Sequence, residues 1–246
     1  MTPFWLDHLL AALLTGFFPI RAATFGYRRL ATASPDQVAA VRHSLYFQAI
    51  ALQWSLAAGV AALWWWRGRD GSWLGLAPRS AAGLGAGLLV AAALGIGLAL
   101  VRARARRDPD ALDRYLEKLP AIERMLPHTL GERNAFYAVS ITAGICEELL
   151  YRGYALWYLT HWMGIVPAVA VSSLVFGIGH AYQGIKGMIA TALVGLFMAL
   201  VYLATRSLWT SMALHALIDL HAGALTYTAL TRARDDAEEG SATGAG

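Results

Sequence analysis

The chain has 246 residues, of which 57% are hydrophobic and 15% are charged, and its net charge is +4. Soluble domains usually carry about 25% charged residues, so the composition excludes an ordinary soluble domain and favours a membrane protein. The single cysteine excludes an intrachain disulfide and a Cys/His zinc finger. Cys146 lies in an apolar stretch, and we interpret it as a packing residue rather than a nucleophile.

Long apolar segments follow one another along the chain. A spanning helix needs about 20 mainly apolar residues, and residues 45–66 and 80–101 are two uncharged segments of 22 residues each. We therefore expect an all-α, polytopic transmembrane helix bundle with about seven spans. The other candidate spans are 4–20, 135–159, 165–185, 187–205 and 208–230. No basic flank precedes the first of them, so we expect it to be retained rather than cleaved as a signal peptide.

Basic residues are distributed unevenly between the two ends of these spans. Seven spans place fifteen Lys and Arg residues on the side of 21–44, 102–134, Lys186 and the C-terminal tail, and four on the other side. Because cytoplasmic loops are enriched in basic residues, we predict a multi-pass protein of the cell (inner) membrane with its N-terminus outside and its C-terminus in the cytoplasm. We interpret the RARARR run at 102–107 as a stop-transfer signal and expect no nucleic-acid partner.

Residues 108–134 form the one long segment between spans. Leu112, Tyr115 and Leu116 recur at helical spacing among charged residues, a pattern typical of a helix that lies on the membrane surface or packs on the protein. Pro120 and Pro127 are expected to interrupt this helix. The tail at 233–246 is polar and rich in small residues, so we predict that it is disordered.

Charged side chains inside the apolar segments are the strongest functional signal, because a charge at the centre of a spanning helix costs about 2.5–3.5 kcal/mol on insertion scales. Glu147, Glu148 and Arg152 lie in the span at 135–159. Glu148 and Arg152 are four residues apart and can neutralise each other on one helix face. Glu147 points about a quarter-turn away, so it has no partner in its own helix and can face a cavity. The alternative is an ion network that only packs helices.

Two further motifs carry the same kind of group. His180 ends the sequence FGIGH one helical turn after Phe176, and His215 and Asp219 are four residues apart in HALID. The latter pair shares a helix face, as two ligands of one metal ion or one water would. Carboxylates and histidines can activate a water for amide hydrolysis with a metal or without one. Neither HExxH nor a rhomboid-like GxSG occurs.

Taken in order, EELLYR at 147–152, FGIGH at 176–180 and HALID at 215–219 resemble the EExxxR, FxxxH and HxxxN/D motifs of the CPBP intramembrane peptidases. This family comprises relatives of the type II CAAX prenyl endopeptidase. The resemblance covers about 131–232 and implies a catalytic helix core there. Residues 1–130 are then N-terminal membrane helices with a basic loop and a surface helix, and 233–246 are the polar tail.

The resemblance also implies roles for individual residues. Glu147 would be the base that activates water, with His180 beside it, while Glu148 and Arg152 would support Glu147 or contact the substrate carboxy-terminus. His215 and Asp219 would bind a metal or form an oxyanion site. The implied ligands of a divalent metal such as Zn²⁺ are Glu147, His180, His215 and Asp219. The family's type II CAAX member has Asn where this chain has Asp219, and an ionised carboxylate fits a metal ligand better because it donates no hydrogen bond.

The predicted activity is an intramembrane metalloendopeptidase that cuts a membrane-associated protein or peptide. The alternative is a non-catalytic membrane protein, either an ion- or proton-coupled carrier or an inactive immunity scaffold. Carriers often contain internal repeats, and the chain shows none, so we favour the peptidase. The Ala-, Gly- and Arg-rich composition indicates a bacterial source, in which prenylated substrates are not expected.

Overall fold

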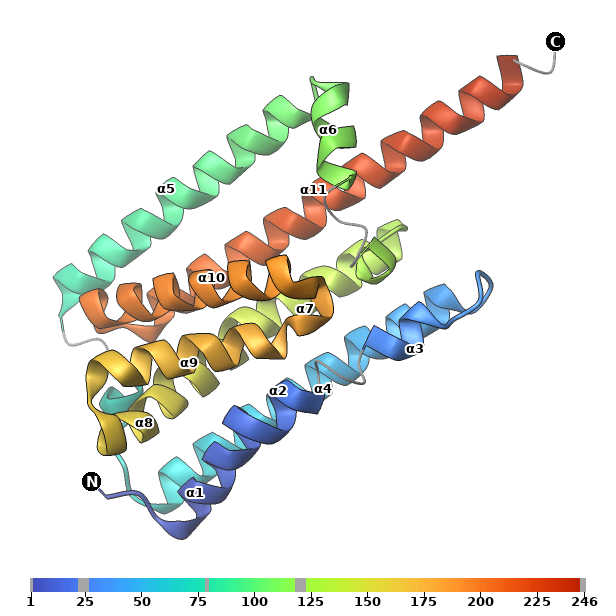
Figure 1. Ribbon diagram of the computed structural model, residues 1–246. Coiled ribbons are helices and arrows are strands. Elements are labelled where there is room, and N and C mark those ends of the chain that lie inside the picture. The colour runs from blue at the N-terminus through green and yellow to red at the C-terminus, as the bar shows by residue number, and fades with distance from the viewer. Residues whose placement is uncertain (1, 22–26, 78–79, 118–122, 244–246) are drawn as a thin grey trace.

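The protein is a bundle of long helices that pack side by side, and the computed structural model places its two termini at opposite ends of the bundle (Figure 1). The structure describes residues 2–21, 27–77, 80–117 and 123–243, and these ranges contain helices and connecting turns but no strand. The predicted all-α fold is therefore confirmed.

The elements follow one another with short connections, and η1 and η5 are π-helical whereas η3, η4 and η6 are 3-10 turns. In chain order they are α1 (Trp5–Ala12), η1 (Leu13–Phe17), α2 (Phe18–Arg21), α3 (Tyr27–Ala31), α4 (Val38–Trp66), η3 (Gly71–Leu74), α5 (Ala81–Ala105), α6 (Pro109–Leu116), η4 (Glu123–Met125), α7 (Leu130–Glu148), η5 (Leu149–Ala155), α8 (Leu156–Met163), α9 (Ile165–Gly179), η6 (Ala181–Gln183), α10 (Gly184–Thr205) and α11 (Leu208–Thr243).

Each predicted span overlaps a helical rod, although the span predicted at 165–185 runs past the end of α9 at Gly179. The first rod consists of α1, η1 and α2, and the fourth consists of α7, η5 and α8. Three helices, α4, α5 and the stretch Ala181–Thr205, are long and apolar enough to cross a membrane by length and composition. These helices identify a membrane protein, while the total of seven spans and the orientation of the termini stay predictions.

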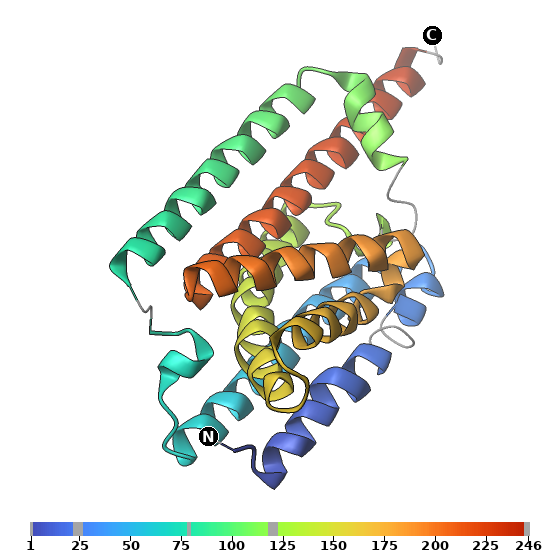
Figure 2. The same cartoon turned by 60° about the vertical axis from the view of Figure 1, so that its left-hand side comes forward.

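Large apolar side chains lie on the outside of the bundle, where a soluble protein would keep few of them. Leu89 on α5 is 73% exposed and Val166 on α9 is 77% exposed. In Figure 2, α5 lies along α11 at one flank of the bundle, with its other side uncovered. An outward apolar surface of this kind is expected of helices that are surrounded by lipid.

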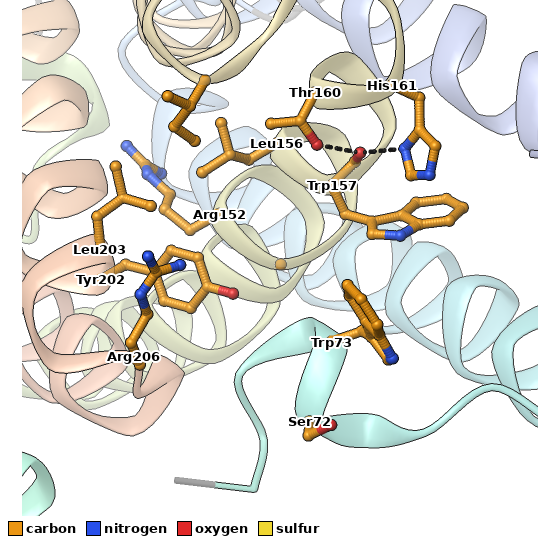
Figure 3. A pocket seen from close by; sticks show the side chains of 12 residues that line it. Ser72, Trp73, Arg152, Leu156, Trp157, Thr160, His161, Tyr202, Leu203 and Arg206 are labelled. Atoms are coloured by element: carbon orange, nitrogen blue, oxygen red, sulfur yellow. Dashed lines mark hydrogen bonds between the residues drawn. The ribbon is translucent and has the colours of Figure 1, made fainter. Parts of the chain in front are cut away.

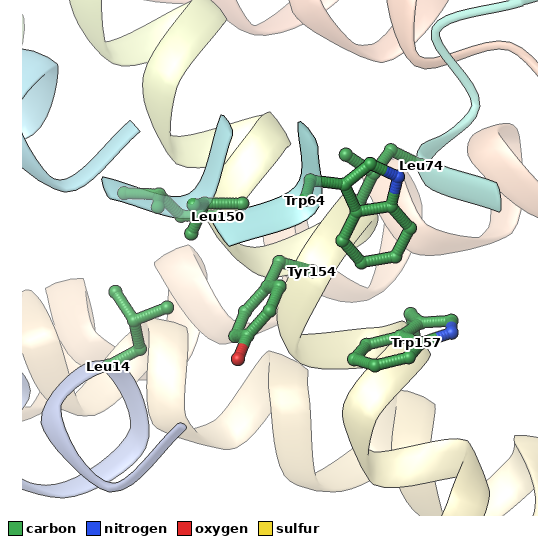
Figure 4. Packing of buried hydrophobic residues seen from close by; sticks show 7 residues of the cluster. Leu14, Trp64, Leu74, Leu150, Tyr154 and Trp157 are labelled. Atoms are coloured by element: carbon green, nitrogen blue, oxygen red, sulfur yellow. The ribbon is translucent and has the colours of Figure 1, made fainter. Parts of the chain in front are cut away.

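An apolar cluster joins the N-terminal helices to the rod formed by α7, η5 and α8 (Figure 4). The rings of Trp64 and Trp157 meet edge to face, with their centroids 4.9 Å apart. The buried members of the cluster are Leu14, Val60, Trp64, Leu74, Leu150, Tyr154 and Trp157. Residues before and after position 130 therefore share one core.

The fourth rod begins at a capping box and lies very close to α11. Thr129 Oγ1 accepts a hydrogen bond from the Glu132 backbone N–H, and Glu132 Oε2 accepts one from the Thr129 N–H. Further along α7, a Cβ added to Gly144 would lie 2.8 Å from Ala216 Cβ. Only glycine permits this approach, which brings the end of α7 against the part of α11 that carries His215.

Helix α6, which lies in the segment at 108–134, packs on the protein. Leu112 of α6 is buried against Leu225 and Ala229 of α11, and the Tyr115 and Thr226 hydroxyls are 3.0 Å apart. Pro120 lies outside the described residues. Of the two positions that the sequence allowed, on the membrane surface or packed on the protein, this helix has the packed one.

The tail differs from its predicted state over the residues that the structure describes. α11 continues to Thr243, so 233–243 are helical rather than disordered. Alanine, arginine and glutamate favour helix, and Arg232 Nε and Asp236 Oδ2, four residues apart, lie 3.3 Å from each other. Residues 244–246 lie outside the described part.

Candidate active site

Six predicted site residues lie on three rods of the bundle. Glu147 and Glu148 end α7, and Arg152 lies in η5, where the helix widens into a π turn. Turns of this kind are rare and often occur at functional sites. His180 directly follows α9, and His215 and Asp219 lie on α11.

Glu148 is fully buried, forms an ion pair within its own rod and contacts α11 through His215. Its Oε1 accepts a hydrogen bond from Arg152 Nη1 at 3.0 Å, with exposed side-chain fractions of 0% and 1%. The same oxygen lies 2.8 Å from His215 Nδ1. An ionised carboxylate only accepts hydrogen bonds, so Nδ1 carries the proton and donates it to this bond. The pairing of Glu148 with Arg152 that the sequence predicted is confirmed, and His215 is held in one orientation.

Helices α10 and α9 enclose the buried Arg152 guanidinium. A Cβ added to Gly195 would lie 2.9 Å from Arg152 Nη2, so a larger residue there would collide with the guanidinium. The Phe176 ring covers the other side, with its centroid 4.3 Å from Arg152 Cζ. Arg152 Nη2 and Glu148 Oε2 have no hydrogen-bond partner within the described chain.

Glu147 has no partner in its own helix, as predicted, but it has one on another helix. Gln53 Nε2, on α4, donates a hydrogen bond of 2.8 Å to Glu147 Oε1. Glu147 Oε2 is buried and has no hydrogen-bond partner among the residues that the structure describes. This oxygen lies 3.9 Å from His215 Nε2, which leaves it directed at the imidazole that Glu148 holds.

Asp219 lies at the edge of this cluster. Its Oδ2 is 3.6 Å from His215 Nε2, and its side chain is 36% exposed, compared with 15% for Glu147. The pair on one face of α11 that the spacing predicted is therefore present. Glu147 and Asp219 flank the same nitrogen of His215 from two different helices.

His180 lies further from this centre. Its Nδ1 is 2.9 Å from the Phe176 carbonyl oxygen, and no nitrogen of His180 is within 4.0 Å of a described carboxylate oxygen. The Phe176 ring contacts both imidazoles, with centroid distances of 4.8 Å to His180 and 5.9 Å to His215. His180 therefore borders the cluster through Phe176 without touching its carboxylates.

The implied metal ligands do not form a complete set. His215 Nε2 lies near one oxygen each of Glu147 and Asp219, but His180 is turned to a backbone carbonyl. Among the described residues, no group of three or more His, Cys, Asp and Glu side chains is arranged to hold a metal ion. The metal therefore stays a prediction, and we assign no chemical step to it.

A pocket of about 320 Å³ lies between η3, η5, α8 and the end of α10 (Figure 3). Its walls include Trp157, Tyr202 and Arg206, and Arg152 is the one predicted site residue that lines it. Because the carboxylates and histidines of the cluster are not part of its lining, we do not assign this pocket to the peptide that would be cut.

Sequence reasoning missed two features of the site. Gln53 is neutral and lies 94 residues before its partner Glu147, so neither charge nor helical spacing pointed to it. The π turn after Glu148 also leaves no periodic signal in the sequence. A polar amide in the middle of an otherwise apolar span was the one available hint of Gln53.

Residues 132–221 match the family model described as type II CAAX prenyl endopeptidase Rce1-like. The matched range contains all six predicted site residues and ends within α11. No curated protein and no solved structure gives a significant match to the chain.

Proposed function

Because residues 132–221 match the type II CAAX prenyl endopeptidase Rce1-like family model, we propose that this chain is an intramembrane endopeptidase of that family. Its substrate is a membrane-associated protein or peptide, in which it hydrolyses one peptide bond. The family match supports a protease, and the buried polar cluster supports water-dependent cleavage within the membrane.

One observation carries the proposal, namely the buried Glu147 Oε2 that has no hydrogen-bond partner in the described chain and lies 3.9 Å from His215 Nε2. Buried polar atoms in native proteins are normally paired. A water molecule can bridge polar groups at this separation, so the atom is suited to receive a proton from a bound water.

The proposed reaction assigns one proton path. Glu147 takes a proton from the water, whose oxygen attacks the carbonyl carbon of the substrate and forms a C–O bond. Glu147 then gives that proton to the leaving nitrogen as the C–N bond breaks. His215 Nε2 orients the water, because Glu148 fixes the other ring nitrogen, and Arg152 holds Glu148 in place.

Asp219 and His180 complete the proposed site from its more open side. Asp219 flanks His215 Nε2 and is the most exposed acid of the cluster, so it can contact substrate or water. A divalent metal such as Zn²⁺ stays part of the prediction. Measuring the metal content of the purified protein beside that of His215→Ala tests it, and equal contents would contradict a His215-bound metal.

The function is tested by comparing the termini of membrane proteins in cells that produce the wild-type chain with those in cells that produce Glu147→Gln. We expect at least one membrane protein to have a shifted terminus that is present with the wild type and absent with the variant. Identical termini in the two cell lines, at equal protein levels, would contradict the peptidase and favour a carrier or scaffold.

The orientation of the chain is a separate proposal that rests on the basic loops. We propose that the end of the bundle with the C-terminus faces the cytoplasm. Labelling of a cysteine introduced in the tail, from one side of sealed vesicles at a time, tests it. Labelling from the outer side alone would reverse the assignment.

A further inference from the structure

Gln53 is the polar residue of α4 that reaches the candidate site. Residues 45–66 contain no charge, and an amide that is buried without a hydrogen bond destabilises a protein. Its Nε2 donates to Glu147 Oε1 at 2.8 Å. Beside it, Trp54 Nε1 donates to Thr142 Oγ1 on α7 at 3.3 Å, so this part of α4 presents its polar atoms to the rod that carries Glu147.

The orientation of the Gln53 amide follows from its partner. A carboxylate accepts hydrogen bonds and cannot donate one, so the NH₂ group of Gln53 must face Glu147. Its other atom, Oε1, is buried and has no hydrogen-bond partner in the described chain. The amide therefore has one hydrogen bond to Glu147 and one acceptor that remains available next to it.

We propose that Gln53 is a positioning residue for Glu147. The hydrogen bond occupies Oε1, so that Oε2, the oxygen without a partner, is directed towards His215 Nε2. Hydrogen bonds to a charged acceptor are roughly twice as strong as neutral ones, and Glu147 has no partner on its own helix to replace this one. The inference rests on the proposed function, because it assigns Glu147 as the base.

The location of Gln53 gives the N-terminal half of the chain a direct part in the site. The family match begins at 132, whereas Gln53 lies on α4. The first 130 residues therefore do more than surround the matched domain, since one of their side chains fixes the carboxylate on which the proposed reaction depends.

The test is Gln53→Met, which keeps the length and the helix propensity of the side chain and removes the hydrogen bond. The matched control is Gln48→Met on the same helix, because exposed Gln48 donates to Ser44 Oγ at 2.7 Å and is not in contact with the site. Two quantities are measured in reconstituted membranes: cleavage kinetics, and the infrared carboxylate band of Glu147, which is identified as the band that Glu147→Gln removes.

We expect Gln53→Met to lower kcat by about 10- to 100-fold, as misplacement of a reacting group does, with KM nearly unchanged. The Glu147 band should also shift. Gln48→Met should leave both at wild-type values. An unchanged kcat in Gln53→Met, with or without a shift of the band, would overturn the inference.

The band also distinguishes failure of this inference from failure of the proposed function. If the wild type cleaved no protein but Gln53→Met still shifted the Glu147 band, the positioning contact would stand and the peptidase would not. If the wild type cleaved its substrate and Gln53→Met did so at the same rate, the peptidase would stand and the positioning role would not.

Discussion

Two buried ionic networks meet the same π turn, and they differ in how completely their atoms are paired. In the first, Arg69 donates to both oxygens of Asp7, at 2.8 and 2.6 Å, and the Tyr154 hydroxyl of η5 donates to Asp7 Oδ1 at 3.1 Å. The Arg69 guanidinium also lies over the rings of Trp64 and Trp157. In the described structure, every buried side-chain nitrogen and oxygen of Asp7, Arg69 and Tyr154 has a hydrogen-bond partner.

The second network, around Arg152 of the same turn, is open. Among its residues, four buried polar atoms have no hydrogen-bond partner in the described part of the chain: Gln53 Oε1, Glu147 Oε2, Glu148 Oε2 and Arg152 Nη2. Unpaired buried atoms cost stability, and the network around Arg152 carries this cost whereas the one around Tyr154 does not. The closed network stabilises the bundle, whereas the open one is suited to chemistry.

The largest expected effect is on the open network. Glu147→Gln should lower the cleavage rate by about 100- to 10,000-fold, because an amide cannot take the proton. The melting temperature should stay near the wild-type value, since the new amide oxygen can still accept from Gln53 and Glu147 Oε2 has no bond to lose. The exposed Glu123→Gln is the control for the same chemical change. A variant that is both unfolded and inactive would place Glu147 with the structural residues.

The next largest effect is expected from replacing the arginine of each network, Arg69 or Arg152. Arg69→Ala and Arg152→Ala should each destabilise the protein by about 3–5 kcal/mol, because each leaves a buried carboxylate without its partner. Only Arg152→Ala should also lower the activity per folded molecule, since Arg152 holds the acid that holds His215. Unfolding in detergent and cleavage by the folded fraction measure the two quantities. Equal activity losses in both variants would remove the distinction between the networks.

A smaller effect is expected at the edge of the open network. Asp219→Asn should keep measurable activity, because the amide oxygen can still contact water or a metal, whereas Asp219→Ala should keep little. Cleavage rates of the two variants, relative to Glu147→Gln, test this order. An inactive Asp219→Asn beside an active Glu147→Gln would assign the base to α11.

Local spacing predicted the parts of the site that lie within one helix. Glu148 with Arg152 and His215 with Asp219 are each four residues apart, and both pairs are in contact. Contacts between distant segments left no such signal: Gln53 reaches Glu147 across 94 residues, and Arg69 reaches Asp7 across 62. The apolar segments predicted the helical rods, because burial in the bundle and contact with lipid both require apolar side chains.

Composition was a poor guide at the tail, and the motif was a poor guide to the position of His180. The residues of 233–243 are polar, yet they are good helix formers that continue α11. His180 was expected beside Glu147, but it follows the last turn of α9 and bonds to the Phe176 carbonyl. Side-chain direction at a helix end depends on the backbone of that end, which a motif alone does not specify.

The smallest expected effect belongs to a third, closed ion pair, at the start of α7 and ahead of the predicted span. Glu132 Oε1 accepts from Arg42 Nη1 at 2.5 Å, and its Oε2 accepts from the His128 backbone N–H at 2.8 Å. Burial raises the pKa of the Glu132 carboxyl, but these hydrogen bonds and the Arg42 charge outweigh burial, so its pKa is lowered.

A carboxyl whose pKa is lower in the folded state than in the unfolded state adds stability above its unfolded pKa, about 4.3. That stability is lost as the pH falls through the folded pKa. The melting temperature of the wild type in detergent should therefore fall more steeply below about pH 4.3 than that of Glu132→Gln, which has no proton to gain. The exposed Glu117→Gln should keep the wild-type slope. Parallel curves for the wild type and Glu132→Gln would mean that this pair, although closed in the structure, contributes no pH-dependent stability, and that full pairing alone does not identify a stabilising network.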